Sequence, residues 1–171
     1  MSTLKFKGEP IHLTGELTAV GSKAPDFTYV KTDLSEAKLS DLQAKVKVLI
    51  AVPSLDTGTC KIETKQFNQR MADKEGVQAL VISQDLPFAM RRFCETEGIA
   101  NVECVSDFRY KQFMQLYNTE MKDGKLRGLS ARVVFVLNKD NVIRYTQLVP
   151  EVSAEPNYEE VMDVVDALLK A

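Results

Sequence analysis

A cysteine in this sequence stands where a helix is expected to begin. Residues 53–60, Pro-Ser-Leu-Asp-Thr-Gly-Thr-Cys, follow an apolar run at 46–52 and precede a helical pattern from Cys60 to about Ala72. The first turn of a helix has free backbone N–H groups and the positive end of the helix dipole. Both favour the thiolate, which is the nucleophilic form of cysteine. The sequence therefore predicts a reactive Cys60, with a small buried apolar residue as the alternative.

Three other residues are candidates to shape a site around this sulfur. Thr57 can cap the helix through its hydroxyl, or hydrogen-bond a group that is held at the sulfur. Pro53 stiffens the turn before the helix and can screen the site from water. Arg132 opens the apolar strand predicted at 132–137. Its charge can reach a site at the end of the sheet, or form a surface ion pair.

The two remaining cysteines differ in their surroundings. Cys94 follows Arg91 and Arg92 in a helical stretch, where it can act as a thiol that condenses with an oxidised Cys60, or be a buried core residue. Cys104 lies in an alternating, strand-like segment, and no role is assigned to it. Thr57 stands where a Cys-x-x-Cys motif would have its first cysteine, so a dithiol exchange site is not expected.

The composition narrows the class of protein further. The chain has 171 residues, 44% hydrophobic and 27% charged, which fits one domain with a core of its own. A net charge of −2 argues against a nucleic-acid-binding surface. The single histidine, His12, and the absence of paired cysteine spacing make a zinc site or a Ser-His-Asp triad improbable.

The pattern of apolar residues predicts strands that alternate with helices. A β-hairpin is expected at about residues 3–14, and a short helical turn at 39–43. Further strands are predicted at 27–30, 46–52, 77–83, 132–137 and 142–148. Helices are predicted at about 60–72, 87–97 and 109–117, and over a C-terminal stripe of Tyr158, Val161, Met162, Val165, Leu168 and Leu169. This order indicates an α/β fold whose last two strands form an antiparallel hairpin.

The start of the chain carries no visible targeting signal. It lacks the apolar segment of about 7–15 residues that a secretory signal contains. The longest apolar runs are far shorter than the about 20 residues that cross a bilayer. A cytoplasmic, reducing location is therefore expected, in which cysteines are catalytic or inert more often than structurally bridged.

Taken together, these motifs resemble those of the thiol peroxidases, the Tpx subfamily of the peroxiredoxins. The peroxiredoxin signature Pro-x-x-x-Thr-x-x-Cys is complete as Pro53, Thr57 and Cys60. The stretches at 85–94 and 128–132 also match, as do the N-terminal hairpin and residues 21–27. The resemblance extends over nearly the whole chain, with its motifs in the family's order.

The resemblance implies a thioredoxin-like fold and a peroxidase of the atypical 2-Cys type. Cys60 would be the peroxidatic cysteine and Cys94 the resolving one, joined in turnover by an intramolecular Cys60–Cys94 disulfide. Thr57 and Arg132 would orient the peroxide, with Pro53 part of its binding site. The substrates would be hydrogen peroxide and organic hydroperoxides, and the reductant thioredoxin. No metal or other cofactor would be needed, and the protein would be a homodimer.

The sequence leaves open the activity and the way in which the disulfide forms. The alternatives to a thioredoxin-dependent peroxidase are a glutathione-dependent peroxidase and a non-enzymatic redox-sensing or binding module on the same fold. If the two sulfurs lie on separate helices, a disulfide needs their Cα atoms within about 7 Å. We therefore expect one or both helices to unwind locally when the disulfide forms.

Overall fold

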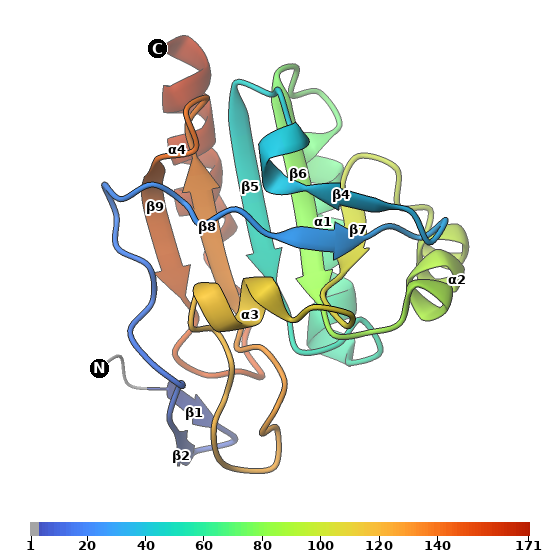
Figure 1. Ribbon diagram of the computed structural model, residues 1–171, viewed down its shortest axis with the longest axis vertical. Coiled ribbons are helices and arrows are strands. Elements are labelled where there is room, and N and C mark those ends of the chain that lie inside the picture. Colours follow the sequence, from blue (N-terminus) through green and yellow to red (C-terminus); the bar gives the residue numbers. More distant parts are fainter. Residues whose placement is uncertain (1–3) are drawn as a thin grey trace.

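A mixed sheet of seven strands forms the centre of the structure, a computed structural model that describes residues 4–171 (Figure 1). The strands are β1 Leu4–Phe6, β2 Glu9–Ile11, β3 Thr28–Val30, β4 Glu36–Lys38, β5 Val46–Ala51, β6 Val77–Ser83, β7 Glu103–Ser106, β8 Val133–Leu137 and β9 Ile143–Leu148. The helices are the 3-10 turn η1 Leu39–Asp41 and the α-helices α1 Gly58–Met71, α2 Pro87–Glu97, α3 Gln112–Leu116 and α4 Tyr158–Lys170.

The strand order in the sheet is β4-β3-β7-β6-β5-β8-β9. Strands β5, β6 and β7 are parallel, and β8 and β9 extend the sheet with antiparallel pairing. All six residues of β5 are buried, as expected for a central strand that is covered on both faces. The helices α1 and α2 follow β5 and β6, so both begin near the carboxyl ends of parallel strands, where α/β sheets generally place their sites.

The two faces of the sheet carry separate apolar cores. Alternation along β5 sends Leu49 and Ala51 to one core, and Val48 and Ile50 to the other. The first core lies under α3 and the N-terminal segments, whereas the second packs against α1, α2 and α4. Figure 1 shows α3 in front of the sheet, with α1 and α4 behind it.

The strands β1 and β2 form an antiparallel hairpin outside the main sheet. Lys5 connects this hairpin to the chain after β9, because its N–H donates to the Pro150 carbonyl and its own carbonyl accepts from the Val152 N–H. The hairpin therefore lies at the lower end of the sheet in Figure 1, the end toward which β5 runs.

The structure confirms the predicted fold class, a mixed sheet flanked by helices with an N-terminal hairpin. The strand at 77–83 and the helix at 87–97 match the prediction at both ends. The helix predicted at 109–117 is shorter and spans only Gln112–Leu116, because Lys111 before it adopts a left-handed conformation with φ of 55°. The edge strand β4 was not predicted. Residue 3, the predicted start of the hairpin, lies outside the described residues.

Candidate active site

The loop between β5 and α1 places Cys60 in the first turn of α1. The Thr57 side chain caps this helix, since its Oγ1 accepts a hydrogen bond from the Cys60 N–H at 3.3 Å. The Thr57 hydroxyl in turn donates to the Ser54 carbonyl at 3.0 Å. Cys60 itself is completely buried. Its sulfur therefore lies at the positive end of a helix, as the sequence predicted, and away from bulk water, where the electrostatic effect of nearby charges is stronger.

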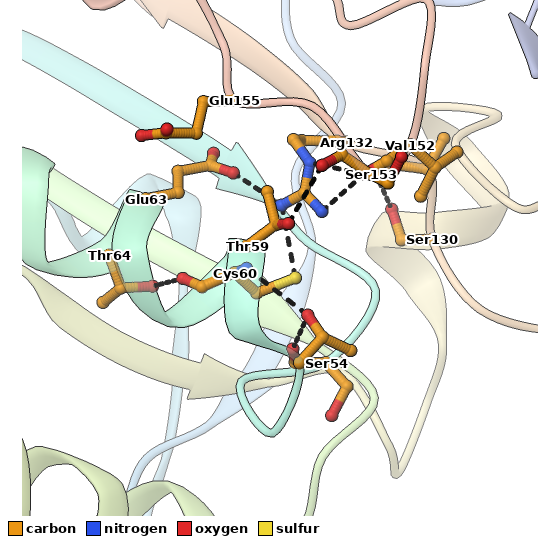
Figure 2. Close-up of polar contacts among 12 residues, drawn as sticks. Ser54, Thr59, Cys60, Glu63, Thr64, Ser130, Arg132, Val152, Ser153 and Glu155 are labelled. Carbon is orange, nitrogen blue, oxygen red and sulfur yellow. Dashed lines mark hydrogen bonds and ion pairs between the residues drawn. The ribbon is translucent and has the colours of Figure 1, made fainter. Parts of the chain in front are cut away.

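Antiparallel pairing brings Arg132 to this sulfur. Ala51 at the end of β5 pairs with Val133 at the start of β8, so Arg132 lies one residue beyond the end of β5. Its Nη1 donates to the Cys60 Sγ at 3.2 Å, as Figure 2 shows. Arg132 is only 1% exposed. The alternative of a surface ion pair is therefore wrong, because β5 and β8 enclose the residue within the fold.

Two groups hold the guanidinium of Arg132 in place. The Val152 carbonyl accepts from Nε at 3.0 Å and from Nη2 at 2.7 Å, which fixes the plane of the guanidinium. The Glu63 Oε1 accepts from Nη1 at 2.7 Å, so the same nitrogen serves both Glu63 and Cys60. Such a paired and planar donor is held rigidly in the orientation that an anionic sulfur requires.

Glu63 is a site residue that the sequence analysis missed. It lies three residues after Cys60 and thus on the same face of α1, which is the signal that points to it. The carboxylate is completely buried, and its Oε2 has no hydrogen-bond partner within residues 4–171. Burial raises the pKa of Glu63 to about 7, although the charge of Arg132 acts in the opposite direction. Glu63 therefore takes up a proton close to neutral pH.

This raised pKa predicts a pH-dependent difference in stability between the native sequence and Glu63→Gln. The ordinary carboxyl pKa of 4.5 applies in the unfolded chain, so the native state binds the extra proton between pH 4.5 and about 7. The stabilisation relative to Glu63→Gln is thus complete below pH 4.5 and is lost as the pH rises to about 7. The total loss should be roughly 3 kcal/mol, since one pKa unit corresponds to about 1.4 kcal/mol.

Urea unfolding of both reduced proteins across this pH range measures the effect. Glu159→Gln is a matched control, because Glu159 is an exposed carboxylate whose partner is Arg70 rather than Arg132. A constant difference between the native protein and Glu63→Gln at all pH values would show that Glu63 does not titrate in this range.

A cavity of about 300 Å³ lies next to Arg132. Pro53, Thr57 and Arg132 line it together with residues from distant parts of the chain, namely Phe6, Lys7, Gly58, Thr59, Leu126, Leu129, Val152 and Ser153. The structure thus brings Pro53, Thr57 and Arg132 together around one hollow beside Cys60. The Thr59 hydroxyl closes one side, where it donates to the Ser153 carbonyl at 3.0 Å.

Asp85 links the Cys60 loop to the start of α2. Its carboxylate accepts from the Ser54 hydroxyl and the Leu55 N–H, both at 2.8 Å, and from the Ser83 hydroxyl at 2.6 Å. The Asp85 carbonyl also accepts from the Ser106 hydroxyl of β7. One carboxylate therefore holds the two loops from which the helices of Cys60 and Cys94 begin.

Cys94 lies on α2, beside α1 but not in the cavity. Glu97 of α2 pairs with Lys61 at 3.1 Å and with Lys65 at 3.3 Å, so the two helices are side by side. Lys61 thus contacts α2 and not the Cys60 sulfur. The Cys94 side chain is half-buried against the same apolar core as Cys60, and all three cysteines are free thiols.

The described residues 4–171 contain no cluster of three or more histidine, cysteine or carboxylate side chains that could hold a metal ion. His12 pairs instead with Asp123, at 2.7 Å between Nδ1 and Oδ2. Across the same residues, none of the helices has the length and the apolar character needed to cross a bilayer.

The fold and the site together define a thioredoxin-like domain with a single cysteine at the helix start under a buried arginine. The Redoxin family model matches residues 19–162. A thiol peroxidase of Leptospira interrogans (serogroup Icterohaemorrhagiae serovar copenhageni) is 50% identical over 99% of this chain and 100% of its own length. A thiol peroxidase of Aquifex aeolicus is 46% identical over 98% of each chain. The crystal structure of a peroxiredoxin-like protein from Aquifex aeolicus superposes with a TM-score of 0.93, at 46% identity over 98% of each chain.

The chain therefore belongs to the thiol peroxidases within the Redoxin family, as its motifs indicated. It is a thiol-dependent peroxidase, an oxidoreductase that acts on peroxides.

Proposed function

We propose that Cys60 is the residue that attacks the peroxide and that Cys94 resolves the oxidised product. The observation that carries this proposal is the 3.2 Å contact between the buried Arg132 Nη1 and the Cys60 Sγ. A thiolate needs no separate base when a fixed cation and a helix start stabilise it, and the only histidine is engaged with Asp123.

In the first step the Cys60 thiolate attacks the terminal oxygen of the peroxide. The sulfur–oxygen bond forms as the O–O bond breaks, and the leaving oxygen takes a proton and departs as water or an alcohol. Cys60 becomes a sulfenic acid. Arg132 and Thr57 line the cavity beside the sulfur, so the guanidinium lies where negative charge develops, and the Thr57 hydroxyl can donate there once it turns away from the Ser54 carbonyl.

In the second step the Cys94 sulfur attacks the sulfenic sulfur and releases water, which gives the Cys60–Cys94 disulfide. Since Cys60 and Cys94 lie on α1 and α2, the ion pairs that Glu97 makes with Lys61 and Lys65 hold the resting arrangement together. We propose that α2, α1 or both unwind locally so that the two sulfurs can meet. A similar backbone in the reduced and disulfide forms would contradict this part of the proposal.

The cavity supports a substrate range that includes organic hydroperoxides as well as hydrogen peroxide. Phe6, Leu126 and Leu129 contribute apolar surface to it, and Thr57 and Arg132 contribute polar atoms. An alkyl group can lie against these side chains while the peroxide oxygens face the polar atoms.

By the resemblance to the family, we propose thioredoxin as the reductant, which returns both cysteines to thiols by dithiol exchange. The same resemblance is the basis for proposing a homodimer and a cytoplasmic location.

A disulfide map after one equivalent of hydrogen peroxide tests the proposed function. We expect mass spectrometry of the digested protein to show one peptide pair that joins Cys60 to Cys94, with Cys104 still alkylatable. Turnover should follow when thioredoxin and its reductase are supplied, and should be much slower with glutathione.

Two results would count against the proposal. Cys60 as a sulfenic or sulfinic acid beside a free Cys94 would remove the resolving role of Cys94. Turnover with glutathione and none with thioredoxin would favour the glutathione-dependent alternative.

A further inference from the structure

Asp85 holds the loop that carries Cys60, although it lies outside the cavity beside Arg132. Its Oδ1 accepts from the Ser54 hydroxyl at 2.8 Å, and its Oδ2 accepts from the Leu55 N–H at 2.8 Å. Hydrogen bonds to a carboxylate are stronger than those between neutral groups. Leu55 is only 3% exposed and Asp85 is partly buried, so water competes little for these contacts. The carboxylate therefore fixes the start of the loop.

The sheet holds Asp85 independently of that loop. Its Oδ2 also accepts from the Ser83 hydroxyl at 2.6 Å, and its N–H donates to the Ser83 Oγ at 3.2 Å. Its carbonyl accepts from the Ser106 hydroxyl. Ser83 and Ser106 are completely buried and pair with each other at the ends of β6 and β7. Asp85 is thus a fixed point to which the Cys60 loop is attached.

Further hydrogen bonds connect Ser54 to the residue that carries the sulfur. The Ser54 carbonyl accepts from the Thr57 N–H at 3.1 Å and from the Thr57 hydroxyl at 3.0 Å. The Thr57 Oγ1 accepts in turn from the Cys60 N–H. Figure 2 shows Ser54 next to the first turn of α1, in which Cys60 contacts Arg132. A displacement of Ser54 therefore moves the helix cap, and with it the sulfur relative to Arg132.

The proposed second step requires that this arrangement be given up. Cys60 is completely buried and its sulfur contacts Arg132, whereas Cys94 lies on α2 outside that cavity. Cys60 therefore has to leave Arg132 before the Cys94 sulfur can reach it. The ion pairs of Glu97 with two half-exposed lysines of α1 hold the helices together only weakly. The more buried contacts of Asp85 are the stronger hold on the Cys60 loop.

We propose that Asp85 is a positioning residue that holds the Cys60 loop for the attack on peroxide and releases it for disulfide formation. This inference rests on the proposed resolving role of Cys94. The hydrogen bonds from Ser54 and Leu55 to the carboxylate keep Cys60 in place during the first step, and they break before the two sulfurs meet. The same contacts thus favour the first step and oppose the second.

Asp85→Ala should slow the first step and speed the second. Because the chain has no tryptophan, rapid quenching and intact mass follow Cys60 from thiol to sulfenic acid and disulfide. The rate of the first step depends on peroxide concentration and that of the second does not. We expect the reaction with hydrogen peroxide to be about tenfold slower, since a displacement of about 1 Å can cost a hundredfold in rate. Disulfide formation should be about two- to tenfold faster, the range that one hydrogen bond contributes to an equilibrium.

Two further variants grade the effect. In Asp85→Asn the amide oxygen can accept from the Leu55 N–H while the amide nitrogen donates to the Ser54 hydroxyl oxygen, so both rates should lie between those of the native protein and Asp85→Ala. Ser54→Ala removes one contact and leaves Asp85 bonded to the sheet. It should change both rates in the same directions as Asp85→Ala but by smaller factors, and it provides the test should Asp85→Ala not fold.

Ser40→Ala is the matched control, because it removes an equivalent contact elsewhere in the fold. The Ser40 hydroxyl and the Ser40 N–H both donate to the Asp26 carboxylate at 2.9 Å. Their neighbours Phe27 and Leu39 belong to the core on the other face of the sheet from α1 and α2. Both rates should stay native in Ser40→Ala.

Opposite changes in the two rates separate positioning from a merely structural role. A loss of stability alone leaves both rates of the folded protein unchanged. The inference would be overturned if both rates changed in the same direction, if neither changed in folded Asp85→Ala or Ser54→Ala, or if Ser40→Ala behaved like Ser54→Ala.

Hydrogen exchange of the reduced proteins tests the hold on the loop without turnover. The amides of residues 54–60 should exchange about two- to tenfold faster in Ser54→Ala than in the native protein, and at the native rate in Ser40→Ala. Equal exchange in Ser54→Ala and the native protein would overturn the inference. If the native sequence formed no Cys60–Cys94 disulfide, the proposed function would fail, while these exchange rates would still judge the hold of Asp85 on the loop.

Discussion

Replacing Cys60 with serine is expected to abolish peroxide reduction. A serine hydroxyl stays protonated at neutral pH, and the side chain that contacts this position is a cation, Arg132, rather than a base. Arg132 and the start of α1 stabilise an anion at this position, and a neutral oxygen gains little from either. Stopped-flow mixing of reduced protein with hydrogen peroxide measures the effect, with consumption by Cys60→Ser at the level of buffer alone.

The native protein provides the other half of this experiment. Its Cys60 should react far faster than free cysteine at the same pH, because the thiolate is held in place beside Arg132. Circular dichroism and thermal unfolding of Cys60→Ser check that the fold is retained. Peroxide consumption by a folded Cys60→Ser protein at the native rate would show that another residue attacks the peroxide.

Replacing Cys94 with serine should leave the reaction of Cys60 with peroxide intact but prevent repeated turnover. Cys94→Ser keeps Cys60, Thr57 and Arg132, so it should still consume one equivalent of peroxide at close to the native rate. It should then stop, since no thiol reaches the sulfenic acid from α2 and thioredoxin has no disulfide to exchange with. Excess peroxide should convert Cys60 to sulfinic acid, which intact mass records as two added oxygens.

The pair of serine variants forms a matched control, because each loses one sulfur from the same protein. The expected pattern is no consumption for Cys60→Ser and one equivalent without turnover for Cys94→Ser. Sustained turnover of Cys94→Ser with thioredoxin would remove Cys94 from its proposed role, whatever the behaviour of Cys60.

Local sequence patterns were sufficient for the elements that carry Cys60 and Cys94. The apolar run of β5, the capping Thr57 and the Pro87 and Gly98 that bound α2 are signals within a few residues of each element. The edge strand β4 gave no such signal, because its residues Glu36–Lys38 are mostly polar and exposed.

The contacts that shape the site depend on distant pairing and could not be read from local patterns. Burial of Arg132 follows from the antiparallel register of β5 and β8, and that register is set only when the sheet assembles. The Arg132–Glu63 ion pair joins β8 to α1. Cys94 and Cys104 likewise reach the same apolar core only when α2 docks on β7. In each case the sequence analysis could single out one residue, but only the tertiary structure shows which residue it contacts.

The attachment of the hairpin has a practical consequence for handling this enzyme. Val152 is bonded on both sides, with its N–H donating to the Lys5 carbonyl and its carbonyl accepting from the Arg132 guanidinium. A single residue, Val152, thus connects the first strand of the chain to Arg132. The end of α4 lies at the opposite end of the molecule (Figure 1). Affinity tags and fusion partners therefore belong at the C-terminus, since an extension of the N-terminus would begin close to the strand that is bonded to Val152.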